Sequence, residues 1–273
     1  MQIASIQMAV VEDDKNATIE KAVDLIRDAG DADLIVLSEL WNIGFMSFER
    51  YVSEAEGKDG PTLSTFRELA KELKVHLHTG SFVEEDGGTY YNSSYLLSPT
   101  GKILANYRKV HLFGFNSRET QILTRGQEVV VAETELGPLG LATCYDLRFP
   151  ELFRRMTEKG AEVFLVCSAW PYPRLEHWIM LNRVRALENQ CFLISSNSAG
   201  MNKGSQFVGH SMVVDPWGII LASGGDEEVI VRSEIDRREV KSARKRFPAL
   251  TDRQEWLNRC EEQSLMDGNQ GEK

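Results

Sequence analysis

The sequence has 273 residues, of which 42% are hydrophobic and 26% are charged, and its 31 Lys and Arg against 41 Asp and Glu give a formal net charge of −10. This composition is typical of a soluble globular protein, and the acidic balance argues against nucleic acid or a membrane as partner, because both favour clustered basic residues. No apolar run approaches the roughly 18 residues that span a bilayer, and residues 1–10 lack the features of a secretory signal. We therefore expect a cytoplasmic protein.

Short apolar runs alternate with segments of helical period along the first half of the chain. Helices are expected where apolar residues recur every three to four positions, and strands where short apolar runs lie between turn residues. These patterns predict helices over 15–29 and 62–73, strands over 3–10, 33–37, 75–83, 89–98 and 102–106, and a polar loop over 114–127.

The second half continues in the same way and contains no Pro-, Gly- or Ser-rich linker. The patterns predict helices over 150–159, 175–189 and 236–246, and strands over 128–135, 140–143, 163–168, 191–197, 206–214, 218–223 and 228–235. No internal repeat is visible. We therefore predict a single α/β domain over residues 1–255, followed by a polar and partly disordered C-terminal extension over 256–273.

Four cysteines are too few and too scattered for a disulfide scaffold, and none forms a C-x-x-C pair. One of them, Cys144, ends the apolar run L-G-L-A-T-C shortly before a helix that Pro150 opens. A thiol near a helix N-terminus is predicted to favour the thiolate, and the N–H of Tyr145 is placed to hold an oxyanion. The alternative is that Cys144 is only a small buried side chain.

Two further reactive side chains lie where strands end. Glu39 closes L-I-V-L-S-E-L-W, among apolar residues that partly desolvate its carboxylate and suit it to proton transfer. Lys109 lies in A-N-Y-R-K-V-H-L-F, also with apolar and aromatic neighbours. Taken singly, each residue has an ordinary explanation. Glu39 could be a solvated loop carboxylate, and Lys109 could be a lysine that protects a sheet edge from pairing.

Together these three motifs, in this order, resemble the nitrilase superfamily of carbon–nitrogen hydrolases, from Met1 to about Arg253. The resemblance implies a catalytic triad of Glu39, Lys109 and Cys144, with Glu119 as a second glutamate. It also implies a four-layer αββα sandwich that dimerises into an extended αββα-αββα sandwich, with no metal and no organic cofactor.

The implied reaction is hydrolysis of an amide to a carboxylate and ammonia through a cysteine thioester. Glu39 would transfer protons and Cys144 would attack the carbonyl carbon. Lys109 and the Tyr145 N–H would stabilise the oxyanion, and Glu119 would orient the substrate or assist the base.

The segment W-P-Y-P-R-L-E-H-W, followed by R-A-L-E-N-Q, is similar to the ω-amidase group. Members of that group hydrolyse short dicarboxylate monoamides such as 2-oxoglutaramate and succinamate. Such a substrate requires a cation for its distal carboxylate, and Arg148 and Arg174 are the candidates. The side chains of Trp170, Phe115 and Tyr145 are expected to wall the pocket.

One departure keeps alternatives open: Ser198 stands where that group would carry an arginine in N-R-x-G. A neutral aliphatic amide or an N-carbamoyl compound is the chief alternative substrate. A catalytically silent binding protein on the same fold is the alternative of another class. The small-molecule amide and a second copy of the chain, in a homodimer or a larger homo-oligomer, are the expected partners.

Overall fold

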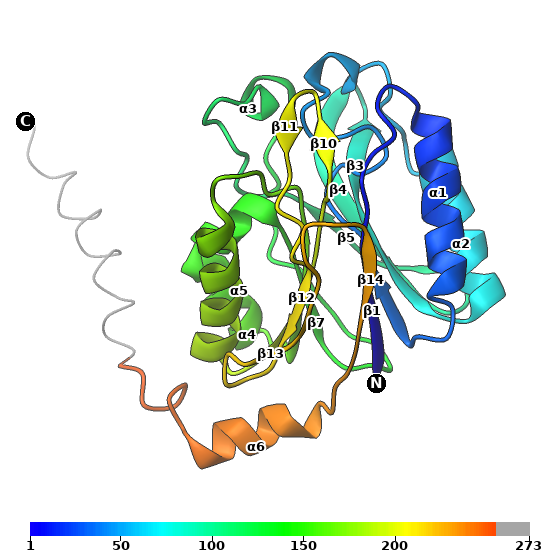
Figure 1. Ribbon diagram of the computed structural model, residues 1–273. Coiled ribbons are helices and arrows are strands. Elements are labelled where there is room, and N and C mark those ends of the chain that lie inside the picture. Colours follow the sequence, from blue (N-terminus) through cyan, green and yellow to red (C-terminus); the bar gives the residue numbers. More distant parts are fainter. Residues whose placement is uncertain (255–273) are drawn as a thin grey trace, which may run out of the picture.

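Two six-stranded mixed sheets lie face to face between two pairs of helices in the computed structural model, which describes residues 1–254 (Figure 1). This arrangement confirms the predicted α/β sandwich of four layers, αββα. The predicted extension over 256–273 lies outside the described residues and stays a prediction, as does the dimer.

The first sheet is built mainly from the N-terminal half of the chain. Its strands, in spatial order, are β14 (Val229–Glu234), β1 (Gln2–Gln7), β2 (Leu34–Val36), β3 (His76–Asp86), β4 (Thr89–Leu97) and β5 (Ile103–Arg108). Helices α1 (Lys15–Asp28) and α2 (Pro61–Leu73) cover its outer face (Figure 1). Strand β2 is buried on both faces: Leu34 and Val36 join the core between the sheets, whereas Ile35 joins the core under these helices.

The second sheet follows the same plan. Its strands, in spatial order, are β13 (Ile220–Ser223), β12 (Met212–Val214), β9 (Phe192–Asn197), β8 (Val163–Ser168), β7 (Leu139–Thr143) and β6 (Val131–Ala132). Helices α4 (Pro150–Glu158) and α5 (Leu175–Asn189) cover its outer face, and α6 (Arg238–Arg246) follows β14 (Figure 1). The remaining elements are η1 (Phe48–Arg50), α3 (Glu119–Ile122), η2 (Cys144–Arg148), β10 (Met201–Asn202) and β11 (Ser205–Gln206).

The two sheets repeat one topology that is not visible in the sequence. In each, three neighbouring strands run parallel and are joined by two helices, β1-α1-β2-α2-β3 in the first sheet and β7-α4-β8-α5-β9 in the second. Two antiparallel strands then extend one edge, and one antiparallel strand closes the other. The repeat lies in the order and direction of the strands, which explains why a search for similar residues missed it.

Three predicted segments differ from the structure. The strand predicted over 128–135 is reduced to β6, and the loop over 114–127 contains the short helix α3. The strand predicted over 206–214 is divided into β11 and β12, because Gly209 and His210 between them both have positive φ angles, 61° and 50°. Among residues 1–254, no helix is both long and apolar enough to cross a bilayer.

The arrangement brings the ends of several strands together between the sheets. Strands β1, β2 and β3 pack against β8 and β9 of the other sheet. Just beyond β2, the backbone N–H of Glu39 donates a hydrogen bond to the carbonyl of Ser168 at the end of β8, over 3.2 Å. Reactive side chains are commonly placed at such strand ends in α/β proteins.

Candidate active site

Four of the predicted side chains, those of Glu39, Lys109, Glu119 and Cys144, meet in one buried cluster. Lys109 Nζ lies 2.7 Å from Glu39 Oε1 and 3.0 Å from each carboxylate oxygen of Glu119. The Cys144 thiol completes the cluster, and besides its burial the charge of Glu39 acts on it by raising its pKa. Glu39, Lys109 and Glu119 are 0% exposed and Cys144 is 6% exposed, so Cys144 is the member of the cluster that meets solvent.

Glu39 is fixed by the close approach of two strands. Gly80 in β3 has a φ of +65°, and a Cβ there would lie 2.2 Å from the carbonyl oxygen of Ser38. Glycine therefore allows the end of β2 to lie against β3. The carboxylate itself is held from the other sheet, because the Ala169 N–H donates to Glu39 Oε2 over 2.9 Å.

Lys109 is held at its backbone on both sides. Its N–H donates to the Asn92 carbonyl over 2.9 Å, and its own carbonyl accepts from the Gly126 N–H over 2.8 Å. A Cβ on residue 126 would lie 1.9 Å from the Arg108 carbonyl oxygen, so this second contact requires glycine. The side chain of Lys109 is thus directed into the interior rather than along an exposed sheet edge.

Cys144 begins the short helix η2 in a strained conformation, with a φ of 46°. The turn is stabilised by Asp146, whose carboxylate accepts from the Thr143 N–H over 2.9 Å and from the Tyr107 hydroxyl over 2.7 Å. The same carboxylate accepts from the His111 N–H over 3.0 Å. Asp146 therefore joins the segment that carries Lys109 to the turn that carries Cys144.

The predicted preference for a thiolate at Cys144 is wrong in the resting structure. Burial raises the pKa of the Cys144 thiol well above its usual value, and the charge of Glu39 adds to this effect, while Lys109 opposes it. The weak field at the start of a short helix does not outweigh that desolvation. The nucleophile therefore needs a base, and Glu39 is the carboxylate whose charge acts on it most strongly.

The two charged groups beside Glu39, the Lys109 ammonium and the Glu119 carboxylate, strongly influence each other's pKa. Burial alone would lower the pKa of Lys109, but the charges of Glu119 and Glu39 outweigh it and hold the pKa above its usual value. Burial raises the pKa of Glu119, and Lys109 opposes the rise. Lys109 is therefore a permanent cation between two carboxyl groups.

A small cavity of about 20 Å³ lies over Cys144 and is lined by Tyr145, Arg148, Trp170 and Arg174. It shares Phe45, Phe113, Pro171 and Arg174 with an outer recess of about 450 Å³. Of the expected wall residues, Tyr145 and Trp170 line the inner cavity. Phe115 lines the outer recess and is 66% exposed.

Both predicted guanidinium groups reach the inner cavity, but only one is anchored there. Arg148 stacks over Trp170, 4.8 Å from the ring centre, and its Nη2 lies 3.2 Å from His177 Nδ1. Arg174 lies 5.7 Å from the ring centre of Phe113. Within residues 1–254, neither forms an ion pair with a carboxylate, and the Arg174 side chain donates no hydrogen bond. Partial burial, together with the charge of Arg148, lowers the pKa of Arg174.

Ser198, the departure from the expected motif, is not among the residues that line either cavity. Its hydroxyl lies 3.4 Å from the Ser38 hydroxyl and 3.5 Å from the Ser168 carbonyl. The serine thus packs behind the strand ends rather than facing the opening over Cys144.

Asn92, whose side chain lies between Glu39 and Glu119, was not predicted from the sequence. The available signal was weak: an asparagine within the run Y-Y-N-S-S-Y, on a strand next to the one that leads to Lys109. The Ala169 N–H was also missed, because a backbone donor leaves no mark in a sequence.

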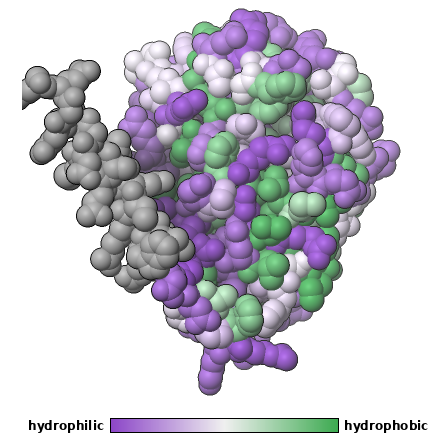
Figure 2. Space-filling model, turned by 90° about the vertical axis from the view of Figure 1, so that its left-hand side faces the viewer, coloured by the Kyte–Doolittle hydropathy of each residue, from purple (hydrophilic) through white to green (hydrophobic). Residues whose placement is uncertain are grey.

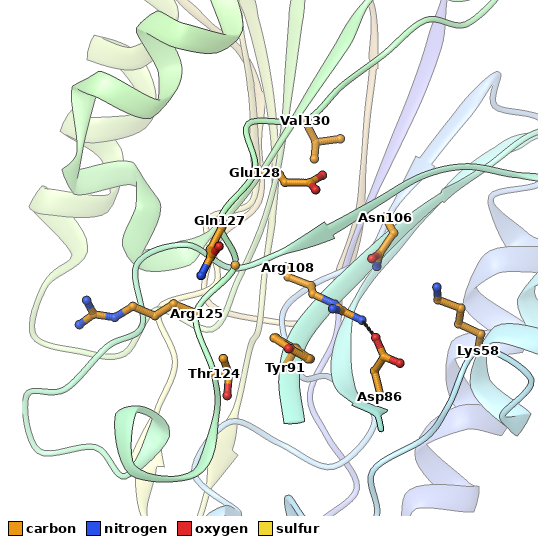
Figure 3. A pocket seen from close by; sticks show the side chains of 11 residues that line it. Lys58, Asp86, Tyr91, Asn106, Arg108, Thr124, Arg125, Gln127, Glu128 and Val130 are labelled. Carbon is orange, nitrogen blue, oxygen red and sulfur yellow. Dashed lines mark hydrogen bonds and ion pairs between the residues drawn. The ribbon is translucent and has the colours of Figure 1, made fainter. Parts of the chain in front are cut away.

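A separate recess of about 410 Å³ lies beside β4 and β5 (Figure 3). Arg108 is its central cation, and it is already paired with Asp86 at 2.6 Å and with Glu84 at 2.8 Å. The Arg125 side chain extends away from the other labelled side chains (Figure 3). No member of the buried cluster lines this recess, so the chemistry is assigned to the cavity over Cys144.

Comparison with known proteins gives matches over most of the chain. The family model for carbon–nitrogen hydrolases matches residues 2–245. The 2-oxoglutaramate amidase of Bacillus subtilis (strain 168) is 37% identical over 252 residues, which cover 92% of this chain and 96% of that protein. Omega-amidase NIT2 of Homo sapiens is 34% identical over 248 residues, which cover 86% of this chain and 89% of that protein. The crystal structure of Saccharomyces cerevisiae Nit3, a member of branch 10 of the nitrilase superfamily, has a TM-score of 0.85 at 31% identity and covers 91% and 94%.

Proposed function

This chain belongs to the carbon–nitrogen hydrolase family, and we propose that it hydrolyses the terminal amide of short dicarboxylate monoamides such as 2-oxoglutaramate and succinamate. The predicted resemblance to the nitrilase superfamily and its ω-amidase group is confirmed, and the protein is an amidase. The observation that supports the substrate class is a cysteine nucleophile beneath a cavity lined by two guanidinium groups without carboxylate partners.

In the acylation half of the reaction, Glu39 takes the proton of the Cys144 thiol as the sulfur attacks the amide carbonyl carbon. The charge that develops on the carbonyl oxygen is stabilised by the nearby Lys109 cation and by the Tyr145 N–H. That N–H lies in the first turn of η2, where N–H groups have no partner within the helix. Glu39 then passes its proton to the leaving nitrogen, the C–N bond breaks, and ammonia departs from a thioester.

In the deacylation half, a water molecule gives a proton to Glu39 and its oxygen bonds to the thioester carbon. The C–S bond breaks, Glu39 returns the proton to sulfur, and the carboxylate product leaves. Glu119 holds Lys109 through both carboxylate oxygens, and its Oε2 also accepts from the Phe113 N–H over 2.6 Å. It thereby links the cluster to the aromatic wall of the opening.

Arg174 is the residue that we assign to the distal carboxylate. Arg148 is stacked on Trp170 and lies against His177, whereas the guanidinium of Arg174 is free of polar partners within residues 1–254. A guanidinium can hold a carboxylate through two parallel hydrogen bonds. Such a pair would neutralise a cation that partial burial and Arg148 already disfavour.

We expect Arg174→Gln to lower kcat/KM for succinamate by about 10- to 100-fold, because hydrogen bonds to charged groups contribute about 1.5–3 kcal/mol. The matched substrate is butyramide, in which a methyl group replaces the distal carboxylate, and its kcat/KM should change by less than about threefold. Ammonia release gives both values. Arg148→Gln serves as the comparison and should have the smaller effect on succinamate.

The same ammonia-release assay distinguishes the alternative substrate classes. If the wild type prefers butyramide to succinamate, the protein is a neutral amidase and the role of Arg174 is withdrawn. Release of ammonia from an N-carbamoyl compound, with neither amide hydrolysed, would identify the carbamoyl alternative.

We also propose that the protein forms a homodimer through the outer face of α5. Met180, Val184 and Leu187 follow one another along this helix, and they are 61%, 36% and 50% exposed. The turn that carries Trp217 adjoins them, because the Arg183 side chain donates to the Gly218 carbonyl over 2.8 Å. Apolar surface lies among polar side chains on this side of the molecule, as Figure 2 shows. A second copy, related by a two-fold axis, would cover this surface and produce the extended αββα-αββα sandwich.

Sedimentation velocity tests the dimer. We expect the wild type to sediment as a dimer and Leu187→Glu to shift it toward the monomer, since two buried carboxylates would face each other across the axis. Val52→Glu, another exposed apolar position at 51% exposure, is the control and should leave the dimer intact. A monomeric wild type at micromolar concentration would refute the proposal.

A further inference from the structure

Asn92 in β4 joins the two carboxylates of the site. Its side chain is fully buried, and Nδ2 lies 2.8 Å from Glu39 Oε1 and 2.8 Å from Glu119 Oε1. A side-chain amide has two N–H groups, so each carboxylate receives one. Its backbone carbonyl also accepts the Lys109 N–H, so this single residue contacts all three charged members of the cluster.

The chemistry fixes the orientation of this amide. If the amide were turned over, its oxygen would face two carboxylate oxygens, and the repulsion would be uncompensated. In the observed orientation Oδ1 is buried and has no partner within residues 1–254. An acceptor left without a donor is a cost that the two contacts of Nδ2 must offset.

The donors around Glu39 are distributed so that one position remains for the thiol. Oε1 accepts from Lys109 Nζ and from Asn92 Nδ2, whereas Oε2 accepts from the Ala169 N–H. A carboxylate oxygen has two lone pairs, so Oε1 is saturated and Oε2 has one acceptor site left. Lys109 Nζ donates to Glu39 and to both oxygens of Glu119, so all of its N–H groups are in use. It could replace a donor lost from Asn92 only by giving up one of these hydrogen bonds.

We propose that Asn92 is a positioning residue, which holds Glu39 and Glu119 side by side as anions and leaves Glu39 Oε2 free to accept the proton of the Cys144 thiol. The inference rests on the roles proposed above for Glu39 and Cys144, but not on the identity of the substrate. Without Asn92, the two carboxylates would have only Lys109 between them. One of them would then take up a proton more readily.

The test is the pH dependence of Cys144 alkylation by iodoacetamide, because this reaction requires the base and no substrate. In Asn92→Ala, we expect the half-maximal pH of alkylation to rise by about one unit, which is the equivalent of one charge-assisted hydrogen bond. The direction follows from the lost donor, because an Asn92 hydrogen bond stabilises the anionic form of a carboxylate: it lowers the pKa of Glu119 against the effect of burial, and Asn92 makes the same contact with Glu39 Oε1. Asn92→Ser, which retains one donor, should give an intermediate shift.

Asn182 in α5 provides the matched control. It is also fully buried, its Nδ2 donates to the Trp178 carbonyl over 2.8 Å, and its Oδ1 has no partner within residues 1–254. Asn182→Ala should lower the melting temperature as Asn92→Ala does, with the alkylation profile unchanged. An unshifted profile in folded Asn92→Ala or Asn92→Ser would overturn the proposal. Failure on succinamate with a shifted profile would instead reject only the substrate.

Discussion

Replacement of Cys144 by alanine is expected to lower kcat for amide hydrolysis by about 10⁴-fold or more, because covalent catalysis is lost with the nucleophile. The fold should be retained, since the sulfur lies at the floor of a cavity and alanine fills most of its site. Ammonia release and the melting temperature give the two measurements. A variant that melts normally and retains activity within tenfold would contradict the assignment.

Cys191→Ala is the control for that experiment. Cys191 is fully buried near α6, where its Sγ lies 3.2 Å from the Ala161 carbonyl oxygen and 3.1 Å from Arg244 Nη2. Cys191→Ala should lower the melting temperature and leave kcat close to the wild-type value. Among the three cysteines of residues 1–254, iodoacetamide should modify Cys144 first and abolish activity in proportion, because Cys167 and Cys191 have no exposed surface.

Lys109→Met should give the largest loss of stability in the site, about 3–5 kcal/mol in the free energy of unfolding, because it leaves buried charge without its partner. Glu39 and Glu119 both lie within 3.0 Å of the ammonium group and are completely buried. Methionine has a similar volume, so the effect reports charge rather than packing. Urea unfolding at neutral pH, followed by circular dichroism, measures it.

A second substitution separates the electrostatic effect from packing. Adding Glu119→Gln to Lys109→Met removes one of the two buried anions that have lost their cation, and it should recover a large part of the lost stability while activity stays absent. If the double variant is as unstable as the sum of the single changes, the three side chains are not coupled and the description of the cluster is wrong.

Much of the framework is visible in the sequence, because strand and helix patterns are local. The helix predicted over 175–189 and the strand over 163–168 coincide with α5 and β8. Glu39, Lys109 and Cys144 stand out because each follows an apolar run and lies within a motif of the family. Glu119 was placed only by resemblance, yet the structure puts it 3.0 Å from Lys109.

The parts that were missed depend on contacts between distant segments. Asn92 matters only in the folded chain. There its strand, β4, pairs with β5, and its side chain reaches Glu39 just beyond β2 and Glu119 at the start of α3. The thiol pKa was misjudged for the same reason, since the burial that raises the pKa comes from packing that a local pattern does not contain. The clustered side chains are therefore marked by local motifs, whereas the effect of burial on their pKa values is not.

If the amide passes through a thioester on Cys144, water and hydroxylamine should compete for the acyl group. With succinamate as substrate, we expect hydroxylamine to divert the acyl group into the hydroxamate at the expense of succinate, while ammonia is still released, and Cys144→Ala should form neither product. Ammonia release that yields succinate alone at every hydroxylamine concentration, or that persists in Cys144→Ala, would contradict the account.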